Sequence, residues 1–274
     1  LDTGRTAAAL AEYQPEAVIH FAAFAYVGES VEDPAKYYHN NVAGTLSLLD
    51  ACRATGVRNI ILSSSCATYG VPETLPISES EPQVPINPYG RSKLMMEHIV
   101  EDYAAAYGIR YVALRYFNAC GADPDGELAE RHDPETHLIP RALMAASGQI
   151  PHLSVFGEDY DTEDGTCVRD YIHVMDLARA HVLAAGYLGD GGISTAFNLG
   201  TGRGVSIREI LTAIHRVTGR EVPIVMEPRR AGDPPALYAD PRLASERLGF
   251  KAEFSDIDTI VGTAAPSFGL DRPS

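Results

Sequence analysis

The chain has 274 residues, with 37 acidic and 22 basic side chains and a formal net charge of −15 at pH 7. This charge argues against a nucleic-acid-binding protein, and a content of 45% hydrophobic residues excludes disordered and collagen-like chains. The sequence has no apolar run of about 18 to 20 residues and no signal-peptide pattern at its start, so we expect a cytoplasmic protein.

The first half of the sequence alternates helical and strand patterns. The predicted elements are, in order, a helix over 1–13, a strand over 16–23, a helix over 33–55, a strand over 58–63, a helix over 89–107 and a strand over 109–117. The strands are almost continuously apolar, which is typical of parallel sheets covered on both faces. This order predicts a doubly wound α/β fold.

The second half begins with a loop rich in Gly, Pro and acidic residues over 120–135. The elements predicted after it are a helix over 139–147, a strand over 153–156, a helix over 174–188, a strand over 195–199, a helix over 207–217, a strand over 222–226 and two short helices. A GxGxG stretch over 200–204 resembles a phosphate-binding turn only weakly. A tight turn explains its glycines without a ligand.

Two groups of residues point to chemistry. Tyr89 and Lys93 lie four residues apart at a predicted helix start, so they share one face, and a nearby ammonium favours the phenolate form of a tyrosine. Such a pair is a candidate general base, although an ordinary exposed helix pair has the same spacing. Three serines over 63–65 end a predicted strand, at the edge where open α/β sheets bind ligands, although serines are also common in plain loops.

Serines at a strand end followed 24 residues later by YxxxK resemble the extended short-chain dehydrogenase/reductase family, and within it the UDP-glucose 4-epimerases. The stretches that carry the resemblance are VIHFAA over 18–23, VGES over 27–30, YYHNNVAGT over 37–45, SSSCATYG over 63–70, PYGRSK over 88–93, LRYFN over 114–118, TEDGTCVRDYIHV over 162–174 and PRRAGD over 228–233. The resemblance implies a Rossmann-like NAD-binding domain over 1–118 with a returning segment 168–200. It also implies a smaller α/β domain over 119–167 and 201–274 that binds the nucleotide sugar.

The activity implied by the resemblance is the interconversion of UDP-galactose and UDP-glucose through hydride transfer between sugar C4 and NAD. In this match Tyr89 removes the proton of the 4-hydroxyl group, Lys93 lowers the pKa of Tyr89 and contacts the nicotinamide ribose, and Ser65 bonds the 4-oxygen. The positions that match NAD contacts are Phe21, Ala22, Ala23, Asn40, Ser63, Tyr89, Lys93, Tyr116 and Phe117. The positions that match UDP-sugar contacts are Asn118, His137, Leu138, Phe156, Arg169, Arg230, Asp233 and Leu237.

Several of these residues also have structural interpretations. Arg169 could pair with the adjacent Asp170, and Phe21 and Phe156 could be core residues. His20, inside an apolar strand, is better explained as a hydrogen-bonded core residue than as a metal ligand. The nine histidines include no HExxH or comparable ligand motif, so no metal is expected. The family usually forms homodimers through two long helices, here 33–55 and 89–107.

Departures from the family leave alternatives open. The Gly-rich turn that holds the NAD pyrophosphate in the family is absent from the sequence, so we expect these 274 residues alone to fold poorly and not to retain NAD. Leu237 stands where relatives have a tyrosine or a smaller residue, which raises the hypothesis that an N-acetylated sugar fits. Other nucleotide-sugar epimerases, a 4,6-dehydratase and a non-catalytic NAD-binding protein are the competing functions. The dehydratases carry an acid pair where this chain has Cys66 and Ala67.

Overall fold

The computed structural model describes residues 1–230 and 233–270. Its main sheet contains four parallel strands in the order β1 (Val18–His20), β2 (Asn59–Ser65), β3 (Arg110–Tyr116) and β8 (Thr195–Leu199). At the carboxyl edge, Ser65 of β2 lies opposite Tyr116 of β3, which lies opposite Leu199 of β8. The predicted doubly wound α/β fold is confirmed. The predicted strand 16–23 is shorter than expected, because residues 21–23 leave the sheet.

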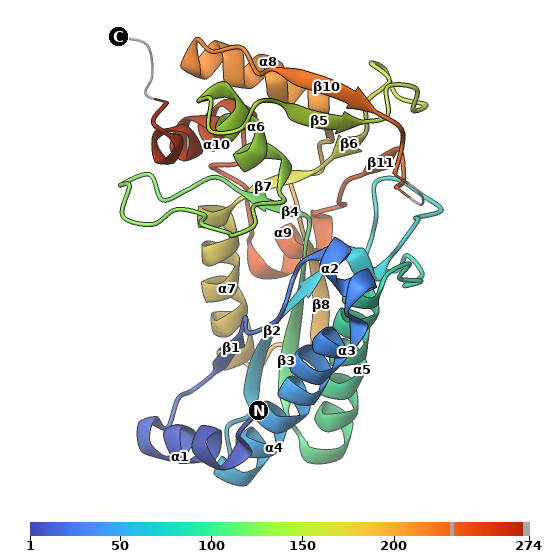
Figure 1. Cartoon of the computed structure of the whole chain (residues 1–274). Helices are drawn as coiled ribbons and strands as arrows, with labels where there is room; N and C mark the ends of the chain where they lie inside the picture. Colours follow the sequence, from blue (N-terminus) through green and yellow to red (C-terminus); the bar gives the residue numbers. More distant parts are fainter. Residues whose placement is uncertain (231–232, 271–274) are drawn as a thin grey trace.

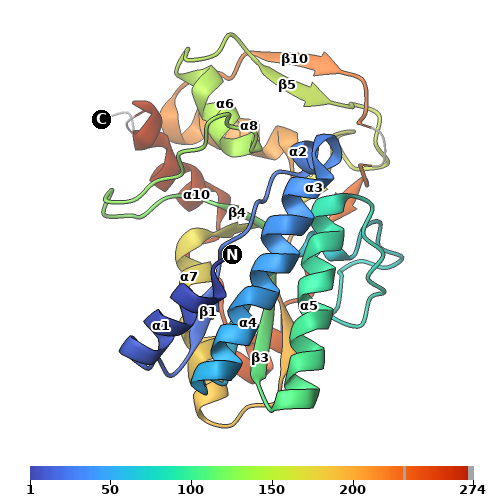
Figure 2. The same cartoon turned by 60° about the horizontal axis from the view of Figure 1, so that its bottom comes forward.

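Helices cover both faces of this sheet, as Figures 1 and 2 show. Ile60 and Leu62 of β2 pack against α4 (Ala43–Thr55) and α5 (Pro88–Tyr107), with α1 (Thr3–Tyr13) lying against α4. Ile61, between them, points to the opposite face, toward α7 (Val174–Gly189) and α9 (Arg242–Leu248). Because both faces are buried, the strands need the nearly continuous apolar sequence from which they were predicted.

The helix predicted over 33–55 consists of several segments. Asp33 caps α3 (Pro34–Tyr37) by accepting a hydrogen bond from the backbone N–H of Lys36. A π-helical segment (Tyr38–Val42) then joins α3 to α4. A preceding helix, α2 (Val27–Glu32), was not predicted, because six residues are too few for an apolar period to be recognised. The π-helical segment had no sequence signal, because its apolar positions fit an ordinary helix.

The second part of the chain contains three small sheets, in the upper half of Figure 1. Strand β4 (Asn118–Cys120) pairs with β7 (Tyr171–His173), and β5 (Leu153–Phe156) pairs with β10 (Ile224–Glu227). Strand β6 (Val168–Arg169) lies between β11 (Ala236–Leu237) and β9 (Val205–Ser206). The sequence predicted β5 and β10 but not the strands of two or three residues, which are too short to show alternation.

Three helices enclose the apolar core of this second part. They are α6 (Leu138–Ala146), α8 (Ile207–Thr218) and α10 (Ile257–Ala264), and their buried side chains include Ile139, Ile210 and Ile260. Short 3₁₀ turns occur at Cys66–Thr68 and Ala265–Phe268. Residues 121–137 contain no helix or strand, as the loop prediction expects. Within the described residues, no helix is both long enough and apolar enough to cross a membrane.

Candidate active site

The end of β2, which consists of serines, and the start of α5 meet at the carboxyl edge of the main sheet. Helix α5 begins at Pro88, and its N-cap residue Asn87 accepts a hydrogen bond from the backbone N–H of Gly90 over 2.8 Å. Gly90 lies so close to the turn after β2 that a Cβ atom there would be 2.3 Å from the carbonyl oxygen of Ala67. This close approach places Tyr89 beside Ser65.

Tyr89 and Ser65 form the polar centre of this edge. Burial raises the pKa of Tyr89 to about 12, while a hydrogen bond from the Ser65 hydroxyl group opposes that rise. Ser65 is itself buried, and its oxygen also accepts the backbone N–H of Ala67 over 3.1 Å. A phenol in this position is protonated at neutral pH unless a positive charge approaches it.

Lys93 is the cation of this centre and is only 3% exposed. Its Nζ donates a hydrogen bond to the backbone oxygen of Ser63 over 2.8 Å and lies 5.9 Å from the centroid of the Tyr89 ring. Burial lowers the pKa of Lys93 to about 8, against the opposing charge of Glu97. In this arrangement the Lys93 ammonium group faces the backbone of Ser63 rather than the Tyr89 hydroxyl group.

Three of the predicted cofactor residues lie at or near the carboxyl ends of β1, β2 and β3. Phe21, directly after β1, is 57% exposed and stacks on His181 with a ring-centroid distance of 4.6 Å. His181 donates from Nδ1 to the backbone oxygen of Leu177, so its Nε2 accepts the hydroxyl proton of Tyr116, over 2.5 Å. Ser63, on the neighbouring strand, opposes the rise that burial causes in the pKa of Tyr116. The exposure of Phe21 excludes its interpretation as a core residue.

The remaining predicted cofactor residues are less closely grouped. Ala22 and Ala23 follow Phe21 at the strand end, where Ala22 is exposed and Ala23 is half-buried. Asn40 lies in the π-helical segment, and its side-chain amide donates to the side chain of Asn41 over 3.1 Å. Phe117 is buried and packs with Tyr69, so its side chain is part of the core rather than an open contact surface.

The predicted sugar-nucleotide residues lie on the small sheets. Arg169 of β6 lies opposite Leu237 of β11 and forms a salt bridge with Asp233. Arg169 does not pair with Asp170, because the Asp170 carboxylate accepts the backbone N–H groups of Thr201, Gly202 and Ala239. Those bonds also explain the GxGxG stretch. Its amide groups bind a carboxylate of the protein itself, so the tight-turn interpretation is correct.

Two further predicted contacts sit at element ends. Phe156 ends β5, and the guanidinium carbon of Arg230 lies 3.9 Å from the centroid of its ring. Asn118 begins β4, and its backbone N–H donates to the backbone oxygen of Asp170 over 2.9 Å. Phe156 is half-buried, and its stacking by a guanidinium group distinguishes it from a plain core side chain.

The two groups of candidate residues meet around Cys66. Cys66 and Leu237 both pack against the apolar cluster that contains Phe117. The Cys66 thiol is also close enough to Tyr89 and to Arg169 for their charges to influence one another. The structure therefore brings residues from β2, α5, β6 and β11, far apart in the sequence, to one region.

A buried polar network behind the serine strand was not predicted. The Glu97 carboxylate accepts a hydrogen bond from Ser64 and a salt bridge of 2.6 Å from Arg115. Arg115 also donates to the hydroxyl group of Tyr69, which in turn donates to Asn198. Glu97 follows Lys93 by one helical turn, and this i, i+4 spacing was the only sign of the network in the sequence.

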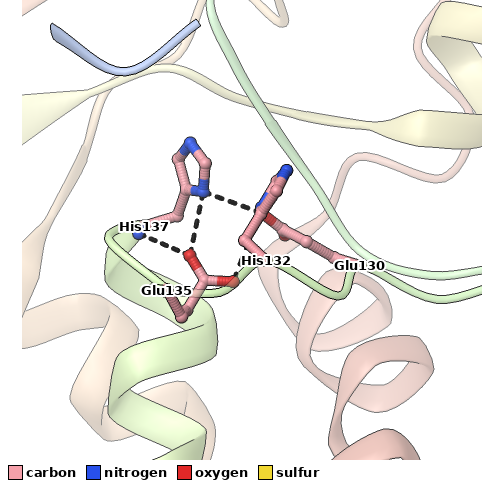
Figure 3. Close-up of side chains that lie close together, drawn as sticks. All are labelled: Glu130, His132, Glu135 and His137. Atoms are coloured by element: carbon pink, nitrogen blue, oxygen red, sulfur yellow. Dashed lines mark hydrogen bonds and ion pairs between the residues drawn. The ribbon is translucent and has the colours of Figure 1, made fainter. Parts of the chain in front are cut away.

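A second polar cluster lies in the loop before α6, where Glu130, His132, Glu135 and His137 converge (Figure 3). Nδ1 of His137 lies 2.8 Å from Glu130 and 3.0 Å from Glu135, and Nδ1 of His132 lies 2.9 Å from Glu130. The hydrogen bond that the His137 imidazole donates to the Glu130 carboxylate is the main cause that raises the pKa of His137. His137 was predicted as a substrate contact, but its association with three other potential metal ligands was not predicted.

Comparisons with known proteins place the chain among nucleotide-sugar epimerases. The model of the NAD dependent epimerase/dehydratase family matches residues 1–200. The chain is 52% identical over 249 residues to the UDP-glucose 4-epimerase of Lacticaseibacillus casei, covering 91% of this chain and 75% of that protein. It is 68% identical to the UDP-glucose 4-epimerase of Brucella ovis crystallised with NAD, with a TM-score of 0.97 and coverage of 99% and 83%. The UDP-glucose 4-epimerase of Bifidobacterium longum, in complex with NAD⁺ and UDP, is 42% identical, with a TM-score of 0.88 and coverage of 96% and 79%.

Proposed function

The chain belongs to the NAD dependent epimerase/dehydratase family, and we propose that it interconverts UDP-galactose and UDP-glucose by inverting C4 of the sugar. The observation that carries the proposal is the grouping of Ser65, Tyr89 and Lys93 at the carboxyl edge of the parallel sheet. Inversion at an unactivated carbon needs a hydride acceptor and a group that moves the hydroxyl proton. The three side chains provide the second requirement.

NAD is the cofactor of this proposal. The residues at the strand ends fit it chemically, because Phe21 offers an exposed aromatic face and Lys93 has two N–H donors beyond its bond to Ser63. Phe21, Ala22, Ala23, Asn40, Ser63, Tyr116 and Phe117 are the proposed contacts, with Phe117 acting through its backbone. Bound there, NAD would supply the acceptor and donor of the hydride that inversion at C4 requires.

Tyr89 is the proposed base. Its phenol oxygen takes the proton from the 4-hydroxyl group when the hydride leaves and gives it back when the hydride returns. Ser65, whose hydroxyl group opposes the rise in the pKa of Tyr89, shares the proton path and holds the sugar 4-oxygen. Lys93 supplies the positive charge that lowers the pKa of Tyr89 from about 12 once its ammonium group turns from Ser63 toward the phenol.

The proposed nucleotide site is anchored by two arginines. Arg169 and Arg230 balance the two negative charges of the diphosphate, and Asp233 orients Arg169 through their salt bridge. Phe156, Asn118, His137, Leu138 and Leu237 complete the proposed set of contacts. A keto sugar must turn over between the two hydride transfers, so firm binding of UDP and loose binding of the sugar suit this reaction.

Replacement of Tyr89 by phenylalanine tests the proposed chemistry. In protein expressed from the complete reading frame, Tyr89→Phe should lower kcat on UDP-galactose by at least about 100-fold while NAD binding is retained. Tyr107→Phe, a change at an exposed tyrosine of the same helix, is the matched control and should leave kcat unchanged. Equal activity of Tyr89→Phe and the unmodified protein would exclude Tyr89 as the base.

The sugar specificity is part of the same proposal. Cys66 follows Ser65, and burial raises the pKa of its thiol to about 12, so it is a poor proton donor for a 4,6-dehydratase. Leu237, half-buried opposite Arg169, leaves more room than a tyrosine would. We expect turnover of UDP-N-acetylglucosamine, and Leu237→Tyr should remove that activity while conversion of UDP-galactose continues. No turnover by the unmodified protein would refute this part.

A homodimer and a cytoplasmic location complete the proposal. Leu46 on α4 and Met95 on α5 are exposed apolar side chains on the two helices predicted to pair. The combined change Leu46→Arg with Met95→Arg should yield monomers in light scattering after size exclusion, whereas Ile193→Arg, at an exposed residue elsewhere, should not. All four cysteines are unpaired, which is typical of proteins in a reducing compartment.

A further inference from the structure

The loop between β4 and α6 contains four side chains with metal-ligating atoms. Glu130 and His132 precede a bend at residues 133–134, and Glu135 and His137 follow it. In an extended chain, side chains two residues apart point to the same side, so each Glu–His pair faces one way and the bend brings the two pairs together. Figure 3 shows Nδ1 of both rings facing the carboxylates.

The spacing of the four groups matches that of tetrahedral metal ligands. Their ligating atoms all lie within 4.8 Å of one another, and the His–Glu separations are 2.8, 2.9, 3.0 and 3.6 Å. Bonds of about 2.0 to 2.1 Å in a tetrahedral zinc site place neighbouring ligand atoms roughly 3.3 Å apart. The four His–Glu separations therefore differ from this spacing by about half an ångström or less, and no pair of ligating atoms has to close by more than about 1.5 Å.

The charge of the cluster also favours a cation. The side chains of Glu130 and Glu135 are only 20% and 7% exposed, and neither forms a salt bridge with a lysine or arginine among residues 1–230 and 233–270. Two carboxylates this close, with imidazoles as their salt-bridge partners among these residues, repel one another. A divalent ion cancels both charges.

We propose that Glu130, His132, Glu135 and His137 form a structural binding site for a divalent transition metal of the zinc class. Two imidazole nitrogens favour zinc over magnesium and calcium, which prefer oxygen ligands alone. With all four positions occupied by protein, the site is closed, as structural zinc sites are. Nε2 of His137 points away from the carboxylates in Figure 3 and stays available for a second hydrogen bond.

The site would fix the loop against two parts of the molecule. Tyr26, after β1, packs its ring against both imidazoles, with ring-centroid distances of 5.5 Å to His132 and 6.2 Å to His137. His137 leads directly into α6, whose first residue, Leu138, is a proposed nucleotide contact. Bound metal would therefore hold the chain between the cofactor side and the nucleotide side in one conformation.

Metal content tests the proposal without any substrate. Untagged protein from the complete reading frame is stripped with EDTA, dialysed against Zn²⁺, washed and analysed by mass spectrometry. We expect one zinc per chain in the unmodified protein. Loss of a residue that only hydrogen-bonds a metal ligand typically lowers metal affinity roughly 10- to 100-fold, so His132→Ala/His137→Ala, which removes two ligands, should lower the affinity for zinc by more than that. His215→Ala removes an exposed His–Glu pair of 3.2 Å elsewhere and should bind zinc normally.

Two additional measurements keep the test decisive if the double variant does not fold. Co²⁺ bound to the unmodified protein should give the intense visible absorption of a tetrahedral site, and Zn²⁺ should displace it. Trypsin cleavage after Arg131, which is exposed between two of the ligands, should slow at least 10-fold with zinc. Sub-stoichiometric zinc, undiminished binding by the double variant or an octahedral cobalt spectrum would each overturn the proposal. None of these results depends on epimerase activity.

Discussion

Adding one methyl group at Gly90 tests whether the close contact between α5 and the turn after β2 positions Tyr89. The backbone of Gly90 is helical, so Gly90→Ala introduces no torsional strain. The new Cβ atom would lie 2.3 Å from the carbonyl oxygen of Ala67 and 3.0 Å from its carbonyl carbon. Both atoms belong to the backbone, so the helix and the turn must separate.

The size of the effect follows from that contact. An ordinary van der Waals separation requires about 1 Å more, and this movement separates Tyr89 from Ser65. A misplacement of about 1 Å in a reacting group costs on the order of 100-fold in rate. We therefore expect kcat/KM to fall about 100-fold, and overpacking to lower the free energy of unfolding by about 1 to 3 kcal/mol.

The assay compares Gly90→Ala with Gly186→Ala. Gly186 lies in α7 with open space around it, so alanine there should keep kcat/KM and raise stability by up to about 1 kcal/mol. Rates are measured as conversion of UDP-galactose to UDP-glucose, and stability is measured by urea unfolding. If Gly90→Ala folds and retains the kcat/KM of the unmodified protein, the contact does not position Tyr89 and the reasoning fails.

Three further predictions concern charge. Lys93→Met removes the cation 5.9 Å from the Tyr89 ring, so the pH at which kcat/KM rises should move up by about one to two units. Lys93→Arg keeps a positive charge and should shift this pH less. An unchanged pH profile of kcat/KM in Lys93→Met would show that Lys93 does not lower the pKa of Tyr89. Arg115→Met leaves the buried Glu97 charge unpaired and should lower the free energy of unfolding by about 3 to 5 kcal/mol. The double variant Arg115→Met/Glu97→Leu should recover part of this loss, because it removes the unpaired charge. If urea unfolding shows that the losses of the two single variants simply add, the two residues are not coupled. Burial, with a smaller effect of Lys93, lowers the pKa of His20 to about 4 from its ordinary value of 6.5. The unfolded chain therefore binds a proton at His20 that the folded protein does not, and lowering the pH from 6.5 to about 4 should reduce the free energy of unfolding by roughly 3 kcal/mol. His20→Gln should not show this loss, and equal losses in both proteins would argue against the explanation.

The sequence predicted those parts of the structure that depend on local patterns. Apolar runs identified β2, β3 and β8, and Asn87, Pro88 and Gly108 mark the ends of α5. His20 is a buried residue hydrogen-bonded to Thr45, as its apolar strand suggested. These signals are local because hydrogen bonding and burial within one element determine them.

Features that depend on contacts between distant residues were not predictable in this way. The bonds from Asp170 to three backbone N–H groups join segments about 30 to 70 residues apart, and no motif marks them. The partner of Arg169 is Asp233 rather than its sequence neighbour, because β6 and β11 place those two side chains together. The cluster around Glu130 was not predicted, because the sequence spacing of its two glutamates and two histidines matches none of the common ligand motifs.

The most direct test of the proposed reaction is proton NMR of UDP-galactose in D₂O, with the protein expressed from its complete reading frame and NAD added. The account predicts conversion to UDP-glucose with hydrogen, not deuterium, at C4, because the hydride returns to the carbon it left. Deuterium at C4 would indicate exchange with solvent and contradict the hydride mechanism. Absence of conversion, in protein that is folded and binds NAD, would contradict the proposed substrate.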